Sequence, residues 1–211
     1  MAASSVRVQF VVDTKVLERR MREAGREFEP RVLLKAIGEK QVAWIMQNFN
    51  SEGGLVGGWE PLSPNTIANR ERGGSSPLHG DTGMLRASLN HYEIIGDEAV
   101  VVGSNMPYAS FHNEGAEGPW TITPRTPGGV LHFKMARSIE RVQRPGREVG
   151  VGGRVGTRLK IESDDVFVRS VEHPGIPQRR FLPTEEEAEG MAVKLIDAKI
   201  EQLERIARGA R

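Results

Sequence analysis

Two long segments, one towards each end of the sequence, repeat apolar residues with the period of an α-helix. In residues 30–49 one stripe is formed by Leu34, Ile37, Trp44, Ile45 and Phe49. In residues 184–207 the stripe is formed by Ala192, Ile196, Ile200, Leu203 and Ala207. Each stripe has to be buried, because most of a helix's stability in a protein comes from packing its apolar face. The two segments therefore predict two long helices on one core, and we expect Trp44 to be buried there.

Four shorter segments have the pattern of β-strands. They are residues 6–12, 92–95, 99–102 and 166–171. Apolar and polar residues alternate in the first, as in a half-buried strand, and Gly96-Asp97-Glu98 predicts a hairpin between the second and the third. The sequence thus predicts an α+β fold, in which a small antiparallel or mixed sheet is covered by helices at 31–49 and 184–207.

Glycine and proline are concentrated in the middle of the chain. Together they number 36 of 211 residues, well above the usual share of about 12%. Residues 50–82 hold three glycine pairs and three prolines. We expect a long loop there that orders on contact with a neighbour, with a short helix after Ser63 and Thr82 as the cap of the next helix. Residues 116–165 form a β-rich, glycine-rich arm or insertion, which projects from a core domain made of residues 1–115 and 166–211.

Charge is unevenly distributed, although the formal net charge is only +1. Residues 134–160 contain eight lysines and arginines and two glutamates, which leaves this block at +6 and the remainder at −5. A block with this charge repels itself unless it meets an anionic partner or stays solvated. We expect Arg137, Arg141, Arg144 and Arg147 to contact an acidic face of an adjacent protein. Non-specific contact with DNA and a solvated loop remain the alternatives.

The residue types that usually carry catalysis or bind metals form no recognisable group in the sequence. The chain has no cysteine, and its five histidines are scattered without pairing at helical spacing. No phosphate-binding, dinucleotide-binding, zinc-protease or serine-hydrolase motif occurs, and no apolar run approaches the roughly 18 residues of a membrane helix. We therefore expect no enzyme activity, cofactor, metal, small-molecule substrate or membrane contact. An enzyme such as a wall hydrolase is the weakest alternative.

A set of short motifs occurs in a fixed order along the chain. It runs through Phe49-Asn-Ser51-Glu52-Gly53, Gly58-Trp59-Glu-Pro61-Leu62-Ser63-Pro64-Asn-Thr66, Arg70, Leu78, Thr82-Gly83-Met-Leu85-Arg86-Ala-Ser88-Leu89, Gly103-Ser104, Tyr108-Ala109-Ser-Phe111-His112-Asn-Glu-Gly115 and Ile176-Pro177-Gln-Arg179-Arg180-Phe181-Leu182. In this order and spacing the motifs resemble those of the tail completion, or virion morphogenesis, family of tailed bacteriophages. The resemblance extends over about residues 36–203 and is interrupted by residues 116–165. Where the family's closing motif has a proline, this chain has Arg180, which we expect to leave the segment less rigid.

The resemblance implies a structural virion protein, not an enzyme: a tail completion or neck ring subunit that joins the tail to the head connector. Its partners would be further copies of itself in a ring, expected to be hexameric, the adjacent head–tail connector, and tail tube or terminator proteins. DNA in the lumen is a further contact. The protein would be made in the cytoplasm of the host bacterium and end in the virion, at the tail or neck. A tail-terminator ring protein and a nucleic-acid-contacting assembly factor are the alternatives, the latter with residues 134–160 as its footprint.

Ten residues are candidates for contacts with other subunits or partners. They are Trp59, Leu62, Tyr108, Phe111, Arg137, Arg141, Arg144, Arg147, Arg179 and Phe181. Five of them also have a structural interpretation. Trp59 would plug the core under its loop, Tyr108 and Phe111 would pack their own helix, and Arg179 and Phe181 would anchor the last helix to the sheet. The sequence leaves both interpretations open.

Overall fold

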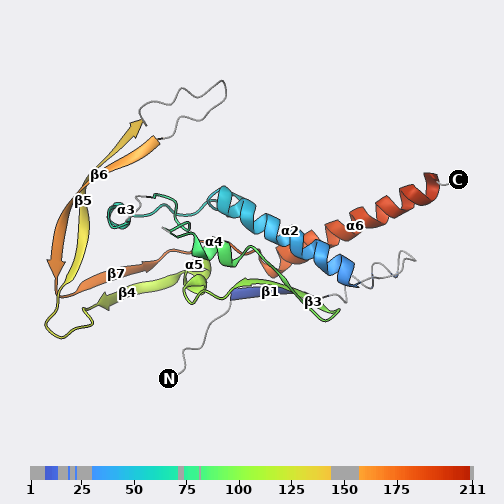
Figure 1. Ribbon diagram of the computed structural model, residues 1–211, viewed down its shortest axis with the longest axis horizontal. Coiled ribbons are helices and arrows are strands. Elements are labelled where there is room, and N and C mark those ends of the chain that lie inside the picture. Colours follow the sequence, from blue (N-terminus) through green and yellow to red (C-terminus); the bar gives the residue numbers. More distant parts are fainter. Residues whose placement is uncertain are drawn as a thin grey trace. The chain divides into compact units, whose positions relative to one another are not determined.

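The computed structural model describes residues 8–13, 19, 22, 30–70, 74–80, 82–143 and 157–209 (Figure 1). The chain divides into two compact units. Unit 1 comprises residues 1–59, 83–116 and 177–211, and unit 2 comprises residues 60–82 and 117–176. Helices occur together with small antiparallel sheets, so the predicted α+β class is confirmed.

Unit 1 contains a three-stranded antiparallel sheet in the order β1-β3-β2. β1 (Val8–Asp13) pairs with β3 (Ala99–Ser104) along its whole length, and β2 (Glu93–Ile95) pairs with the first half of β3. The predicted strand near 6–12 and the predicted hairpin are therefore confirmed. Buried and half-buried residues alternate along β3, as expected when one face of a sheet is covered.

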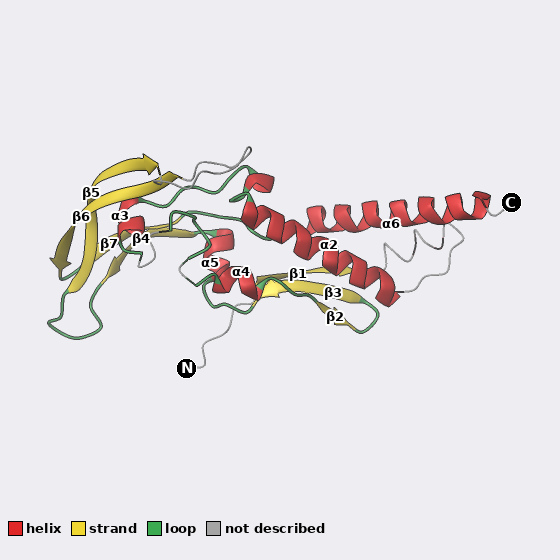
Figure 2. Ribbon diagram, turned by 45° about the horizontal axis from the view of Figure 1, so that its top comes forward, coloured by secondary structure: helices red, strands yellow, loops and turns green. Residues whose placement is uncertain are grey.

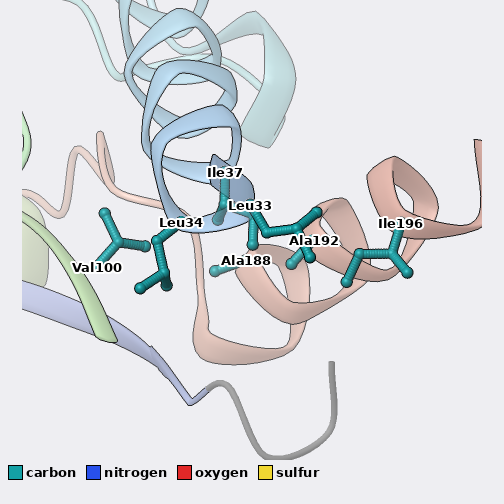
Figure 3. Close-up of a cluster of buried hydrophobic side chains, with 7 residues drawn as sticks. All are labelled: Leu33, Leu34, Ile37, Val100, Ala188, Ala192 and Ile196. Carbon is teal, nitrogen blue, oxygen red and sulfur yellow. The ribbon is translucent and has the colours of Figure 1, made fainter. Parts of the chain in front are cut away.

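Both predicted long helices are confirmed, as α2 (Pro30–Asn50) and α6 (Glu185–Gly209). They meet β3 in one buried cluster (Figure 3), formed by Leu33, Leu34, Ile37, Val100, Ala188, Ala192 and Ile196. The small alanines of α6 let its backbone come close to the larger side chains of α2. Trp44 is only half-buried, so its predicted burial is wrong. It lies at the flank of the α2 face whose centre is occupied by Gln41 and Ile45, both buried.

The first turn of α6 forms a capping box. Thr184 Oγ1 accepts the N–H of Glu187 at 3.2 Å, and the N–H of Thr184 donates to Glu187 Oε2 at 2.8 Å. This reciprocal pair satisfies two backbone donors that a helix start would otherwise leave open. Glu185, Glu186 and Glu187 also favour the start electrostatically, because a helix N-terminus carries partial positive charge.

Unit 2 consists largely of two two-stranded ribbons (Figure 2). β4 (Ala116–Ile122) pairs with β7 (Val171–Ile176), and β5 (Leu131–Gln143) pairs with β6 (Thr157–Val168). The β5–β6 pairing is antiparallel and contains a bulge at Arg137. Among the residues of 117–176 that the structure describes, none is fully buried. The ribbons therefore depend on backbone pairing more than on a core of their own.

The strand predicted at 166–171 is wrong in both its bounds and its sheet. Val168 ends β6 and Val171 begins β7, and both strands belong to unit 2, not to the β1-β3-β2 sheet. The physical reason is that residues 157–168 find a partner of matching length in residues 131–143. Pairing along the whole strand satisfies more backbone groups than a short contact with the edge of another sheet would.

The short elements are η1 (Gly54–Val56), α3 (Pro64–Ala68), α4 (Met84–Ser88) and α5 (Ala109–Glu114). The helix predicted after Ser63 is confirmed as α3, and Ser63 Oγ accepts the N–H of Thr66 at 3.2 Å. The cap predicted at Thr82 is wrong. Gly83 is the N-cap of α4, at φ 66°, and no side chain caps this start.

Leu34→Ala should lower the free energy of unfolding by about 2–5 kcal/mol, because it leaves a cavity in the cluster shared by α2, α6 and β3. Val32→Ala is the matched control on the same helix. That side chain is 60% exposed, so its truncation should change stability by no more than about 0.5 kcal/mol. Denaturant unfolding measures both, and equal losses would show that this cluster is not the core of unit 1.

Candidate functional site

The extended segment that leads into α6 is held by α5. The N–H of Arg179 donates to the carbonyl oxygen of His112 at 2.7 Å. Asn113 Oδ1 accepts the N–H groups of Phe181 and Leu182, both at 3.1 Å. Backbone groups of a buried segment need partners. Here α5 supplies them in place of a neighbouring strand.

The same segment also contacts the C-terminal end of α2 and the turn that follows it. Trp59 Nε1 and Asn48 Nδ2 both donate to the carbonyl oxygen of Arg180, at 2.8 and 3.2 Å. The ring of Phe49 lies edge-on to Trp59 at 5.2 Å and is tilted against Phe181 at 5.7 Å. All three rings are buried. Motif residues that are far apart in the sequence thus form one aromatic cluster (Phe49, Trp59 and Phe181).

A glycine turn provides the space for Trp59. Two backbone hydrogen bonds close the C-terminal end of α2. The N–H of Gly53 donates to Asn48 O at 2.9 Å, and the N–H of Glu52 donates to Phe49 O at 3.2 Å. This pair of bonds is typical of a helix that ends in left-handed residues. Gly53 has φ 84°, and a Cβ atom there would lie 2.4 Å from Trp59 Cδ1. The indole therefore packs directly on the backbone, and only glycine fits.

The side chain of Arg180 ties the segment to the first turn of α6. Its Nη2 donates to Glu187 Oε1 at 3.0 Å, and its Nη1 pairs with Glu187 Oε2. The hydrogen bond from Arg180, helped by Thr184, lowers the pKa of Glu187 in spite of the opposing effect of burial. The proline of the family's closing motif would stiffen the backbone at this position. In this chain the bidentate ion pair between Arg180 and Glu187 fixes the segment instead.

A family model described as the phage virion morphogenesis family matches residues 12–201. The chain belongs to this family. The resemblance found in the sequence is thereby confirmed, and with it a structural or assembly role in the phage virion. Neither a curated protein nor a solved structure matches the chain. Within the described residues, no helix has the length and apolarity to cross a membrane, and no group of three or more acidic, histidine or cysteine side chains could hold a metal.

In this phage virion morphogenesis protein the candidate contact residues of unit 1 fall into two groups. Trp59, Arg179 and Phe181 are buried. Buried side chains offer little surface to a partner, and the aromatic cluster accounts for the burial of Trp59 and Phe181. Tyr108 and Phe111 are 39% and 52% exposed, and they alone of this set remain in the interface proposed below.

In unit 2 one of the basic candidate residues has an acidic partner within the chain that the sequence did not indicate. Arg137 is exposed at the bulge of β5 and forms an ion pair with Asp164 of β6. The basic block of residues 134–160 ends just before the acidic residues of β6. The antiparallel register places those acids beside the basic residues of β5. Leu62 is half-buried. Arg141 lies in β5 with its side chain outside the description, and Arg144 and Arg147 lie outside the described residues.

Gly53→Ala should destabilise the protein more than Gly57→Ala. Both glycines have positive φ, so an alanine costs about 1–2 kcal/mol at either site. A Cβ atom at Gly57 would meet nothing within 4 Å, whereas at Gly53 it would collide with Trp59. We expect the loss at Gly53 to be at least about twice that at Gly57. Denaturant unfolding followed by tryptophan fluorescence measures both, and equal losses would contradict the packing of Trp59 on Gly53.

The stability of the protein should fall as the pH drops below about 6.5 because of His112. Burial, and then the positive charge of Arg179, lower the pKa of His112 below its ordinary value of 6.5. The unfolded chain therefore binds a proton at a pH where the folded protein does not, and stability decreases with falling pH. His112→Gln should flatten this part of the curve. Unfolding measured between about pH 8 and about pH 5 tests this, and an unchanged pH dependence in the variant would contradict it.

Proposed function

We propose that this protein is a tail completion or neck ring subunit, which joins the tail of a bacteriophage to its head connector as part of a homo-oligomeric ring. The observation that carries the proposal is the family match over residues 12–201, together with the ordered motifs. A ring forms when two different surfaces of a chain meet head to tail and the rotation closes. Six copies remain our expectation, since such a ring would match a six-fold tail tube.

The surface that we propose for contact in unit 1 is the outer side of α5. Ala109 and Ser110 of this helix are buried, and His112 and Asn113 hold the segment before α6. The helix is thus fixed from within, while Tyr108 and Phe111 are exposed next to these contacts. Aromatic side chains on a fixed support give a large contact area for little loss of side-chain entropy.

For residues 134–160 we propose contact with an acidic face of an adjacent protein in preference to DNA. The described part of the ribbon reduces the case for DNA, because Arg137 pairs with Asp164 and the register places Lys134 opposite Asp165. Non-specific DNA binding depends on basic side chains that neutralise phosphates. Lys134 and Arg137 face acids of their own ribbon and therefore contribute little to such binding.

Replacing Tyr108 and Phe111 together by serine should leave the protein folded and sharply reduce the yield of tailed, infectious particles. An aromatic anchor at an interface contributes about 2 kcal/mol or more, so the loss of one corresponds to roughly 30-fold weaker binding at each contact. Ile95→Ser is the matched control, because Ile95 is also an exposed apolar residue of unit 1, at 54%. The measurements are circular dichroism of the purified variants and particle yield after complementation of a phage that lacks the gene.

Images of the particles decide the outcome. Particles that lack tails in the double variant and are normal in the control support the proposal, as does a ring of this chain on the tail axis in wild-type particles. Normal particle yield in a folded double variant would contradict the assigned surface. A single copy per particle, or a site away from the axis, would contradict the ring.

A further inference from the structure

The β5–β6 ribbon of unit 2 has two outer edges, and the outer edge of β5 is closed by α3. Asn69 Nδ2 donates to the carbonyl oxygen of Lys134 at 2.7 Å, and Asn69 Oδ1 accepts the N–H of Lys134 at 2.7 Å. Asn65 Oδ1 accepts the N–H of Ala136 at 2.9 Å. These side-chain amides occupy the backbone groups that a further strand would use, which is one way in which proteins protect a sheet edge.

The same contacts show which backbone groups of β6 point outwards. Lys134 directs both its N–H and its C=O away from β6, so Lys134 and Asp165 form a non-hydrogen-bonded pair. Successive residues of a strand direct their N–H and C=O groups to opposite edges. The outer edge of β6 therefore presents the backbone groups of Ile161, Ser163, Asp165 and Phe167. Within the part of the chain that the structure describes, no backbone hydrogen bond from another segment reaches these groups. The outer edge of β6 is therefore open where that of β5 is closed.

The order of charges along β6 is complementary to itself. In the sequence, Arg158 and Lys160 precede Glu162 and Asp164. A second β6 can run antiparallel along the outer edge with Ile161 opposite Ile161. The register positions of Lys160 and Glu162 then face one another, and so do those of Arg158 and Asp164, each twice; Asp164 also pairs with Arg137 of its own ribbon. These are the non-hydrogen-bonded positions of the new pair, where side chains approach most closely and opposite charges stabilise a sheet. No like charges face one another in this register.

We propose that the outer edge of β6 binds the β6 strand of a second copy of this chain, so that two ribbons form one four-stranded antiparallel sheet. A two-stranded ribbon is marginally stable by itself, and in this one Phe167 is 63% exposed beside His132, on which it stacks at 4.6 Å. The proposed contact has two-fold symmetry, whereas a cyclic ring of identical subunits is built from head-to-tail contacts. The inference therefore concerns the free protein and does not depend on the proposed ring.

Ser163→Pro tests the pairing in the purified full-length protein. The N–H of Ser163 points outwards, so proline removes a donor from the outer edge and leaves the bonds to β5 in place. We expect light scattering to find a dimer for the wild type and for Ser163→Ala, which keeps the N–H. The dimer dissociation constant should rise at least about tenfold in Ser163→Pro. A wild type that is monomeric at all concentrations, or a dimer that Ser163→Pro does not weaken, would overturn the proposal.

The absence of cysteine from the chain allows a second test that does not depend on how proline is tolerated. In the proposed register the Cα atoms of the two Ile161 residues are about 5.5 Å apart, which lies within the range of Cα separations that disulfides span. Ile161→Cys should form a disulfide between two copies under mild oxidation. Ser138→Cys, at an exposed position of β5, should not. Equal cross-linking of both variants, or none in Ile161→Cys, overturns the pairing, and neither result bears on the role in the particle.

Discussion

Two oxygen atoms, the carbonyl oxygen of Arg180 and the side-chain oxygen of Asn113, hold the segment on which the rest of unit 1 depends. They accept four hydrogen bonds between them, from Trp59, Asn48, Phe181 and Leu182. A buried polar group left without a partner costs about 1–3 kcal/mol, so an extended segment outside any sheet is stable only when groups elsewhere in the chain provide such bonds. Because α6 begins directly after this segment, the position of its buried face follows from the same contacts.

The motifs that identify the family turn out to hold the fold together. Phe49, Trp59 and Phe181 form the aromatic cluster, and Gly53 has to be glycine because the indole of Trp59 lies on its backbone. Residues with such roles tolerate little change, since both cavities and added atoms in a packed interior are destabilising. The ordered motifs therefore identify the family well and give little information about the contact surface.

The features that the sequence predicts correctly are those whose signals lie within a few residues of each other. α2, α6, the β2–β3 hairpin and the Ser63 cap all have local signals, in helical period, turn residues or a capping side chain. The features that it misses depend on distant residues. Asn113 caps backbone groups 68 and 69 residues further along the chain, and Arg137 pairs with a carboxylate 27 residues away. A single asparagine or arginine gives no local sign of such a partner, and the same applies to the strand pairing of residues 157–168.

The two units differ in the source of their stability. Unit 1 has a core of fully buried apolar side chains. The described ribbon residues of unit 2 rely on strand pairing, on the asparagines in and directly after α3, on the exposed ion pair Arg137–Asp164 and on the hydrogen bond between His132 and Asp165. Exposed ion pairs contribute about 0–1 kcal/mol each. We therefore expect unit 2 to open more readily than unit 1. Segments of low local stability are the ones that can rearrange at little cost when a neighbour binds, and this property suits the contacts with other chains that we propose for the ribbon.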